Sequence, residues 1–279
     1  MLTGRVAVIT GAGRGIGAAA AKIFAREGAK VVVNDLNIEP ATEVVDEIKA
    51  AGGSALAIAG SVTDEALPDQ LMDAAMGEYG KIDVLVNNAG FTWDGMVHKM
   101  SDKQWQMIVD CHATAPFRMI RAAAPYMRDV AKQEKQTTGT TEDRCIINVS
   151  STSGLHGNFG QANYAFCKMG VVGLTKTVAK EWGAFGVRCN AVAFGMISTR
   201  MTSSFGDGEA IVVDGQKVPQ GMPANVADAW DTDELLQQNV PLGRKGLVDE
   251  AAGGMLMLAS PYASYVTGHT LEVTGGFGI

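Results

Sequence analysis

The sequence lacks closely spaced cysteine pairs and histidine clusters. It contains four cysteines, scattered without a CxxC spacing: Cys111, Cys145, Cys167 and Cys189. Zinc sites and disulfide frameworks need regularly spaced ligands or partners, so we expect no metal and no disulfide. We interpret the cysteines as buried free thiols in a reducing compartment. His98, His156 and His269 also lack the spacing of metal ligands.

Long hydrophobic runs and an excess of positive charge are absent as well. No apolar stretch approaches the roughly 18 residues that would cross a bilayer. Residues 1–5 lead directly into an apolar segment and leave no room for a signal peptide. The net charge of −7 argues against a general attraction to nucleic acid or to an acidic membrane. We therefore expect a cytoplasmic protein with neither nucleic acid nor a membrane as its partner.

Aromatic residues are scarce, at 6%, whereas the chain has 34 glycines and is 47% hydrophobic. This composition is typical of buried aliphatic strands joined by tight turns. Apolar runs of strand type alternate with segments of helical periodicity. Strands are predicted at residues 6–9, 31–33, 54–59, 84–86, 146–149 and 187–192, and helices at 15–27, 40–51, 68–79, 102–127 and 161–182.

This alternation of strands and helices predicts the fold class. Consecutive βαβ units form parallel sheets with right-handed crossovers. The sequence therefore predicts an α/β protein with a Rossmann-type doubly wound parallel sheet, whose ligands bind at the carboxyl ends of the strands. Because we find no internal repeat and no linker, we expect residues 1–279 to form a single domain.

Two segments interrupt the alternation. Residues 130–144 are polar and turn-rich, so we interpret them as a solvated loop away from the ligand end of the sheet. Residues 209–219 have apolar runs on either side of Asp214-Gly215, which is a strong hairpin signal. The hairpin follows the sixth strand, and we expect a lid near 203–240; an oligomer contact or a decoration of the surface is the alternative.

A glycine-rich turn joins the first strand to the first helix at residues 10–17 (TGAGRGIG). Glycine lets the chain turn sharply and lets a pyrophosphate approach the amides at the helix N-terminus. In this strand-turn-helix context, the run predicts a dinucleotide site. Its candidate contacts are Gly11, Arg14, Gly15, Ile16 and Gly17.

An acidic residue at the end of the second strand bears on which dinucleotide binds. Asp35 stands 18 positions beyond Gly17, where it can accept hydrogen bonds from the adenosine ribose hydroxyls and repel a 2′-phosphate. Arg14 has the opposite effect, because a cation in the turn can receive that phosphate. A carboxylate facing a phosphate costs more than one exposed arginine returns, so the sequence favours NAD over NADP.

Two further motifs follow in order: NNAG at residues 87–90, and Tyr164 with Lys168 four positions later, preceded by Ser151. With the glycine-rich turn, they make the whole chain resemble the short-chain dehydrogenase/reductase family. The resemblance implies an oxidoreductase that interconverts a secondary alcohol and a ketone, commonly as a homotetramer. It also implies further cofactor contacts: Leu36, Ser61, Val62, Asn88, Gly90, Tyr164, Lys168, Gly195, Ile197 and Thr199. Phe194 departs from the family, which has a proline before this glycine.

The chemistry of the last motif follows from its residues. Tyr164 and Lys168 are spaced to lie on one helical face. A phenol with a pKa near 10 is a poor base at neutral pH, but a nearby ammonium and the positive nicotinamide would lower that pKa. Tyr164 is then the acid/base, and Ser151 holds the substrate oxygen against it. Lys168 would also bind the nicotinamide ribose.

The family's fourth catalytic position differs here. Alignment on Trp105 and Phe117 places His112 where the family has an asparagine that supports a water in a proton relay. Imidazole passes protons near neutral pH, so we include His112 among the catalytic residues. The alternative is a histidine that only packs in the helix.

A narrower resemblance concerns the substrate. His112, residues 33–36, residues 61–62 and residues 157–164 resemble the (3R)-hydroxyacyl-CoA dehydrogenase domain of peroxisomal multifunctional enzymes, although bacterial 3-oxoacyl reductases share much of the pattern. The preferred substrate is a 3-hydroxyacyl or 3-oxoacyl thioester. The alternatives are a steroid or cyclic alcohol and, in a different class, a dinucleotide-binding sensor or scaffold without turnover. His156, between Ser151 and Tyr164, is expected to border the substrate.

Three arginines on the predicted long helix allow two interpretations. Arg118, Arg121 and Arg128 are spaced by three and seven residues. They could meet an acidic carrier protein or the phosphate of CoA, whereas a solvated helix face is the simpler explanation and the one we favour.

Overall fold

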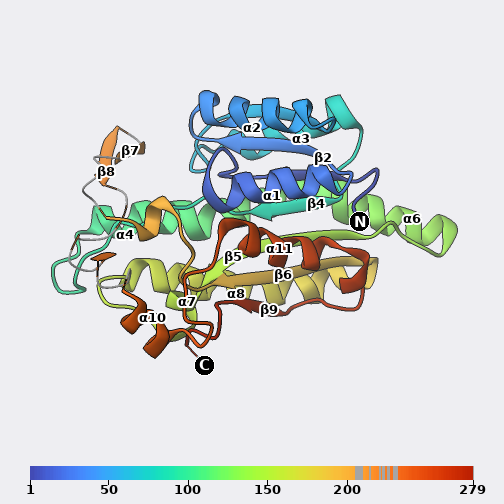
Figure 1. Ribbon diagram of the computed structural model, residues 1–279. Coiled ribbons are helices and arrows are strands. Elements are labelled where there is room, and N and C mark those ends of the chain that lie inside the picture. The colour runs from blue at the N-terminus through green and yellow to red at the C-terminus, as the bar shows by residue number, and fades with distance from the viewer. Residues whose placement is uncertain are drawn as a thin grey trace.

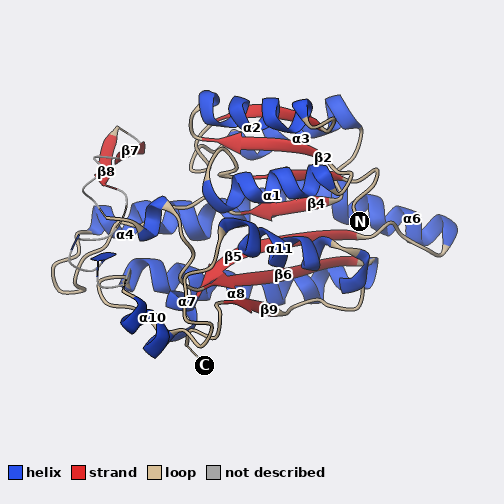
Figure 2. Ribbon diagram, viewed as in Figure 1, coloured by secondary structure: helices blue, strands red, loops and turns tan. Residues whose placement is uncertain are grey.

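A parallel sheet with helices on both faces forms the body of the computed structural model (Figures 1 and 2). The structure describes residues 1–204, 210–213, 215–219, 221, 224, 227–228 and 232–278. The sheet of this part of the chain has seven strands in the order β3-β2-β1-β4-β5-β6-β9, all parallel. Their bounds are Val6–Ile9 (β1), Lys30–Asp35 (β2), Ser54–Ala59 (β3), Val84–Asn87 (β4), Arg144–Ser151 (β5), Val187–Phe194 (β6) and Thr270–Val273 (β9). The Rossmann-type fold predicted from the sequence is confirmed.

The strands lie in the interior because both of their faces are aliphatic. Every residue of β1, β4 and β6 is buried, as expected for strands that helices cover on both sides. One apolar core lies between the sheet and α1 (Gly15–Arg26), α2 (Ile38–Ala50) and α11 (Val248–Ala259). A second core lies between the other face and α3 (Leu67–Tyr79), α5 (Ala115–Ala124) and α8 (Ala162–Trp182). From β1, the chain adds β2 and β3 on one side of the sheet and then returns to add β4 on the other side. This change of side between β1 and β4 opens a crevice at the carboxyl ends of these two strands.

The helix predicted over residues 102–127 is longer than expected and irregular. It comprises α4 (Asp102–Val109), a π-helical turn (Asp110–Thr114), α5, a second π-helical turn (Pro125–Asp129) and α6 (Val130–Thr138). The prediction of a solvated loop over 130–144 is therefore wrong. Residues 130–138 contain good helix formers and no glycine or proline, and Gly139 ends the helix in a left-handed conformation. Glu134 on this helix pairs with Arg144 at the start of β5.

Several helices and one strand were not predicted from the periodicity of the sequence. A short helix, α7 (Thr152–His156), begins directly after β5, and α10 (Asp233–Asn239) precedes α11. Strand β9 pairs with β6 and completes the sheet edge. In the described residues, no helix is both long enough and apolar enough to cross a membrane.

The predicted hairpin is present as β7 (Ala210–Val213) and β8 (Gln216–Pro219), which pair antiparallel. It lies beyond the carboxyl ends of the sheet strands, beside α4 (Figure 1). Asp214 of the turn lies outside the described residues, while Gly215 has a positive φ of 73°. Val218 is fully buried, and Lys103 at the start of α4 donates to Gln216 at 2.7 Å. The hairpin is thus bonded to α4, which leads directly into the π-helical turn that contains His112.

Candidate active site

A cavity of about 720 Å³ opens at the carboxyl ends of the strands. Every residue that the sequence assigned to the site lines it: Gly11, Arg14, Gly15, Ile16, Gly17, Asp35, Leu36, Ser61, Val62, Asn88, Gly90, His112, Ser151, Tyr164, Lys168, Gly195, Ile197 and Thr199. Ile211 of the hairpin and His156 also line the cavity. No cluster of metal-ligating side chains occurs within the described ranges.

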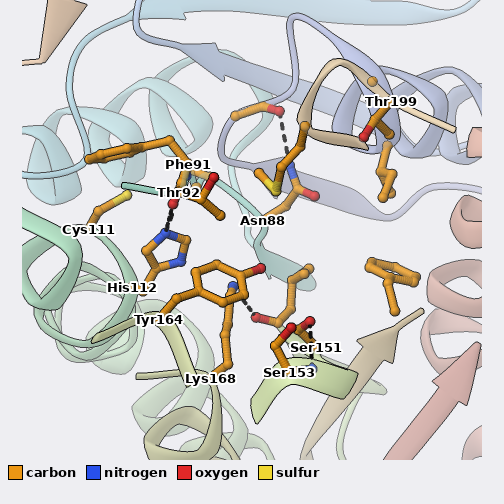
Figure 3. A pocket seen from close by; sticks show the side chains of 18 of the residues that line it. Asn88, Phe91, Thr92, Cys111, His112, Ser151, Ser153, Tyr164, Lys168 and Thr199 are labelled. Atoms are coloured by element: carbon orange, nitrogen blue, oxygen red, sulfur yellow. Dashed lines mark hydrogen bonds between the residues drawn. The ribbon is translucent and has the colours of Figure 1, made fainter. Parts of the chain in front are cut away.

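The glycine-rich turn is held against the NNAG segment by close backbone contact. A Cβ atom on Gly11 would lie 2.6 Å from Ala89 Cα, and one on Gly17 would lie 2.2 Å from the Gly11 carbonyl oxygen. Asn88 donates to the carbonyls of Thr10 and Gly11, both at 2.9 Å (Figure 3). These contacts require glycine at positions 11 and 17, and they keep the turn open for an anion at the N-terminus of α1.

Thr10 is a site residue that the sequence reasoning passed over. It is buried at the end of β1, and its hydroxyl accepts hydrogen bonds from the backbone amides of Asn88 and Ala89, both at 3.1 Å. It thereby fixes the two segments that flank the cavity. The signal in the sequence was a hydroxyl residue directly before the first glycine, where an aliphatic residue would otherwise continue the strand.

The residues present fit a dinucleotide. Gly13 leaves no room for a side chain, because a Cβ there would lie 2.8 Å from Asp35 Oδ2. The Gly13 amide donates to that oxygen at 2.9 Å, and Asp35 Oδ1 faces no donor among the described residues. Arg14 occupies the N-cap position of α1, and its exposed side chain has no ion-pair partner in the part of the chain that the structure describes. An acceptor for ribose hydroxyls, bonded to Gly13, and the cation of the adjacent Arg14 therefore both adjoin the glycine-rich turn.

Ser151, Tyr164 and Lys168 meet in the buried centre of the cavity (Figure 3). Ser151 ends β5, while Tyr164 and Lys168 occupy one face of α8, with Lys168 Nζ 5.5 Å from the tyrosine ring centre. Lys168 donates to the Val149 carbonyl at 2.7 Å. Residues that the sequence linked by their spacing and type thus form one cluster in the structure.

Burial dominates the electrostatics of Tyr164 in the protein alone. Burial raises the pKa of the Tyr164 hydroxyl, and its interaction with Ser151 offsets only part of that rise. Burial also lowers the pKa of Lys168 to about 8. The protein by itself therefore holds Tyr164 as a neutral phenol, because burial disfavours the charged phenolate.

His112 lies in the π-helical turn and packs edge-on against Tyr164, with ring centres 5.0 Å apart. Its Nε2 lies 2.7 Å from the Phe91 carbonyl oxygen and 3.2 Å from the Phe91 amide nitrogen. Its Nδ1 is buried without a hydrogen-bond partner in the described residues. Burial and the charge of Lys168 hold the pKa of His112 well below its ordinary value, so the ring is neutral at neutral pH.

The space for His112 depends on the NNAG segment. A Cβ atom on Gly90 would lie 2.4 Å from His112 Cε1, so only glycine allows the imidazole ring to approach. Cys111, the preceding residue, also lines the cavity, and burial raises its thiol pKa to about 12. The thiol is therefore unreactive at neutral pH.

The segment at the end of β6 has Phe194 where the family has a proline, and the strand pairing continues through this residue. Strand β6 continues through Phe194, which is in register with Ser151 on one side and Val273 on the other. A Cβ on Gly195 would lie 2.9 Å from Thr274 Cα, so this glycine is required for the strand to leave the sheet here. Thr199 caps the short helical turn that follows it.

The three arginines of α5 and the following turn are mostly engaged within the chain. Arg118 donates to the Thr63 carbonyl and pairs with Glu65. Arg121 lies over the ring of Phe117, and Arg128 pairs with Asp129. The solvated and internally paired interpretation accounts for these contacts.

Asn163 is a second residue that the sequence reasoning did not single out. Its side chain is fully buried; it donates to the carbonyls of Trp93 and Gln104, each at 3.2 Å, and accepts from the Tyr164 amide at 2.8 Å. It fixes the first turn of α8 to the loop after β4. An asparagine beside the tyrosine, at a position that becomes buried, was the available signal.

Comparisons with known proteins agree with this site. A family model described as short chain dehydrogenase matches residues 5–210, and one described as Enoyl-(Acyl carrier protein) reductase matches residues 217–278. A 3-oxoacyl-[acyl-carrier-protein] reductase of Synechocystis is 40% identical over 99% of this chain and 97% of its own. The peroxisomal hydratase-dehydrogenase-epimerase of Saccharomyces cerevisiae is 44% identical over 72% of this chain and 22% of its own. A blue fluorescent protein from a metagenomic library, solved in complex with NADPH, has a TM-score of 0.80 at 31% identity, covering 100% of this chain and 99% of that one.

Proposed function

The chain belongs to the short-chain dehydrogenase family, an oxidoreductase family that binds a nicotinamide dinucleotide, and we propose that it interconverts 3-hydroxyacyl and 3-oxoacyl thioesters with NAD. The names of two relatives, a 3-oxoacyl reductase and a peroxisomal multifunctional enzyme, support this substrate class. We propose further that it acts in the cytoplasm as a homotetramer. The exposed apolar side chains of α4, α5 and α8 support association: Trp105, Phe117, Phe166 and Met169.

One observation carries the proposal: Ser151, Tyr164 and Lys168 converge in the cavity that the glycine-rich turn enters from its other end. A sensor or scaffold would have no use for a buried acid/base, a buried cation and a serine hydroxyl in one place. Burying the ammonium of Lys168 and the hydroxyl of Tyr164 costs stability, and catalysis accounts for that cost.

The residues divide the chemistry between them. A bound nicotinamide dinucleotide supplies or receives the hydride. Ser151 donates a hydrogen bond to the substrate oxygen and holds it beside the Tyr164 hydroxyl. Tyr164, kept protonated by burial, gives its proton to a ketone oxygen as that oxygen gains charge; it takes the proton back when an alcohol is oxidised. Lys168 holds a positive charge beneath the tyrosine ring and stabilises the phenolate left behind.

His112 takes part in the proton relay as a neutral ring. The short contact to the Phe91 carbonyl fits an Nε2–H that donates, which leaves the Nδ1 lone pair as an acceptor inside the cavity wall. A neutral imidazole with one free acceptor can orient a water that returns the proton to Tyr164. This differs from relay by an imidazolium, which burial disfavours.

NAD is the proposed cofactor because Asp35 is fixed at the ribose end of the turn by the Gly13 amide. A 2′-phosphate there would meet a carboxylate that cannot swing away without losing this hydrogen bond. Arg14 is exposed, so its attraction for a phosphate is screened by water.

The test follows nicotinamide absorbance with acetoacetyl-CoA and longer 3-oxoacyl-CoAs, offering NADH and NADPH separately. Oxidation of NADH that improves with chain length supports both the substrate class and Asp35 as selector. Turnover with NADPH alone would show that Arg14 outweighs Asp35. Intact NADH binding with no thioester turnover would contradict the substrate class and direct the search to steroids and cyclic alcohols.

A further inference from the structure

A row of hydrogen-bonded residues leads away from the catalytic serine along the cavity wall, first through the backbone amide of Ser153 and then from side chain to side chain. Ser151 Oγ accepts from the Ser153 amide at 3.1 Å, and Ser153 Oγ accepts from Asn158 Nδ2 at 3.4 Å. Asn158 Nδ2 also donates to Gln161 Oε1 at 3.1 Å, and Gln161 Nε2 donates to Asp94 Oδ2 at 3.0 Å. All five residues line the cavity, and we call them the polar track.

The polar track runs from the buried centre to the mouth of the cavity. Ser151, Ser153 and Gln161 are half-buried, whereas Asn158 and Asp94 are exposed. Figure 3 shows its inner end, with Ser153 beside Ser151 and close to Tyr164. A substrate whose reacting oxygen lies between Ser151 and Tyr164 can therefore extend along these side chains toward solvent.

The outer end of the track is fixed in place by its neighbours. The Gly95 amide donates to the Gly160 carbonyl at 2.8 Å, and Gln104 donates to the Asp94 carbonyl at 3.3 Å. The first bond joins the loop after β4 to the loop that leads into α8, and the second joins the loop after β4 to α4. Asp94 is thus presented by two connected loops, and its position does not depend on the Gln161 contact alone.

Two acceptors at the outer end of the track already have donors. Asn158 Oδ1 accepts from the Phe159 amide, and Asp94 Oδ2 accepts from Gln161 Nε2. Asp94 Oδ1 has no partner in the part of the chain that the structure describes. Partial removal from water raises the pKa of Asp94, and the Gln161 bond offsets only part of this rise. A carboxylate oxygen accepts but does not donate, so a ligand that displaces water from Asp94 Oδ1 must offer an N–H or O–H to bond with it.

We propose that Asp94 is a specificity-determining residue that accepts a hydrogen bond from an amide N–H in the carrier arm of the thioester substrate. This inference rests on the proposed function. An acyl thioester of a carrier has an amide-bearing arm on one side of the reacting carbonyl and an apolar chain on the other. The polar track suits the arm, while apolar side chains elsewhere in the cavity wall suit the chain: Phe91, Met196, Met201, Ile211 and Phe277.

The test compares two 3-oxobutanoyl thioesters of similar length, one of N-acetylcysteamine, which has an amide N–H, and one of butanethiol, which has none. Asp94→Ala is compared with Asp46→Ala, which changes an exposed aspartate of α2 outside the cavity. Loss of one hydrogen bond to a partly exposed carboxylate should raise KM for the amide-bearing thioester about fivefold. For the butyl thioester, KM should stay within about twofold of wild type, and kcat should hold for both.

Each outcome bears on a different statement. Equal KM values for the amide-bearing thioester in wild type and Asp94→Ala would overturn the role of Asp94 while leaving the proposed function intact. An equal rise in KM for both thioesters would also overturn it, because the effect would not depend on the amide. A wild-type enzyme that binds NADH but reduces neither thioester would overturn the proposed function, and this inference with it.

Discussion

The two ends of the cavity are built from different materials. Where the chain leaves β1 and β2, the wall is largely backbone: glycines that cannot carry a Cβ, amides at the start of α1 and one carboxylate held by the Gly13 amide. Where it leaves β4 and β5, the wall consists of polar residues joined mostly through their side chains, from Ser151 out to Asp94. Backbone recognition suits a cofactor of constant shape, because its spacing is fixed. Side-chain recognition can be changed residue by residue, which suits a substrate.

The sharpest test of this division lies at its centre. Tyr164→Phe removes the acid/base hydroxyl but leaves the glycine-rich turn untouched. Turnover should fall about 10³-fold or more, since proton transfer loses its donor, while the Kd for NADH should change little. Steady-state rates and fluorescence titration of NADH measure the two effects. A variant that keeps wild-type turnover would contradict the role of Tyr164, and loss of NADH binding would contradict the separation of the two ends.

A substitution in the backbone-built end should weaken NADH binding. Gly11→Ala places a Cβ 2.6 Å from Ala89 Cα at a residue with φ of 61°. We expect NADH affinity to fall and the free energy of unfolding to drop by about 2–4 kcal/mol, from the clash and the strained φ together. Gly77→Ala is the matched control, because its helical site in α3 has open space; it should be neutral or slightly stabilising. Denaturant titrations and NADH binding compare the two variants, and equal behaviour would contradict the close-approach argument.

A smaller effect is expected where a side chain enters the backbone-built end. Asp35→Asn keeps an acceptor for the Gly13 amide but removes the charge that faces a 2′-phosphate. The ratio of kcat/KM for NADH to that for NADPH should fall about tenfold or more, corresponding to roughly 1.4 kcal/mol. Arg14→Gln should move the ratio in the other direction. If the ratio in Asp35→Asn equals that of wild type, Asp35 does not select the cofactor.

The smallest expected effect is on how the free energy of unfolding varies with pH. His112 has a pKa held well below its unfolded value of about 6.5, so the unfolded chain binds a proton that the folded chain does not. This neutral histidine contributes stability that is present above pH 6.5 and is lost as pH falls below it, by about 1.4 kcal/mol per unit until its folded pKa is reached. His112→Asn should remove that slope. Urea titrations at pH 7.5, 6.0 and 5.0 measure the difference, and parallel curves for both proteins would contradict a buried neutral imidazole.

Sequence reasoning reached the backbone-built end more completely than the other. The glycine-rich turn, Asp35 and the Ser151, Tyr164 and Lys168 set follow from spacing, and each lines the cavity. Residues 130–144 were misread because polarity was taken for a loop, although helix formers without glycine or proline continue a helix. The π-helical turns could not be predicted from the sequence, because they shift the 3.6-residue period on which the helix prediction depends.

The polar track could not be predicted for a different reason. Asp94, Asn158 and Gln161 come from two loops far apart in the sequence, and no local period relates them. Lys168 lies 5.5 Å from the ring centre of Tyr164, but the effect of burial on the pKa of this phenol could not be predicted from the sequence. Contacts between loops and desolvation both depend on the assembled structure.

The hydrogen bond between Gly13 and Asp35 has a consequence for anyone who redesigns this enzyme. The carboxylate that we propose to set cofactor preference also accepts the hydrogen bond that fixes the glycine-rich turn. Replacing it with a small apolar residue would leave the Gly13 amide without its acceptor, so a gain in NADPH use would come with a loosened loop. Preference and rigidity are therefore one design variable here, and a successful exchange must keep a hydrogen-bond acceptor at position 35 while changing its charge.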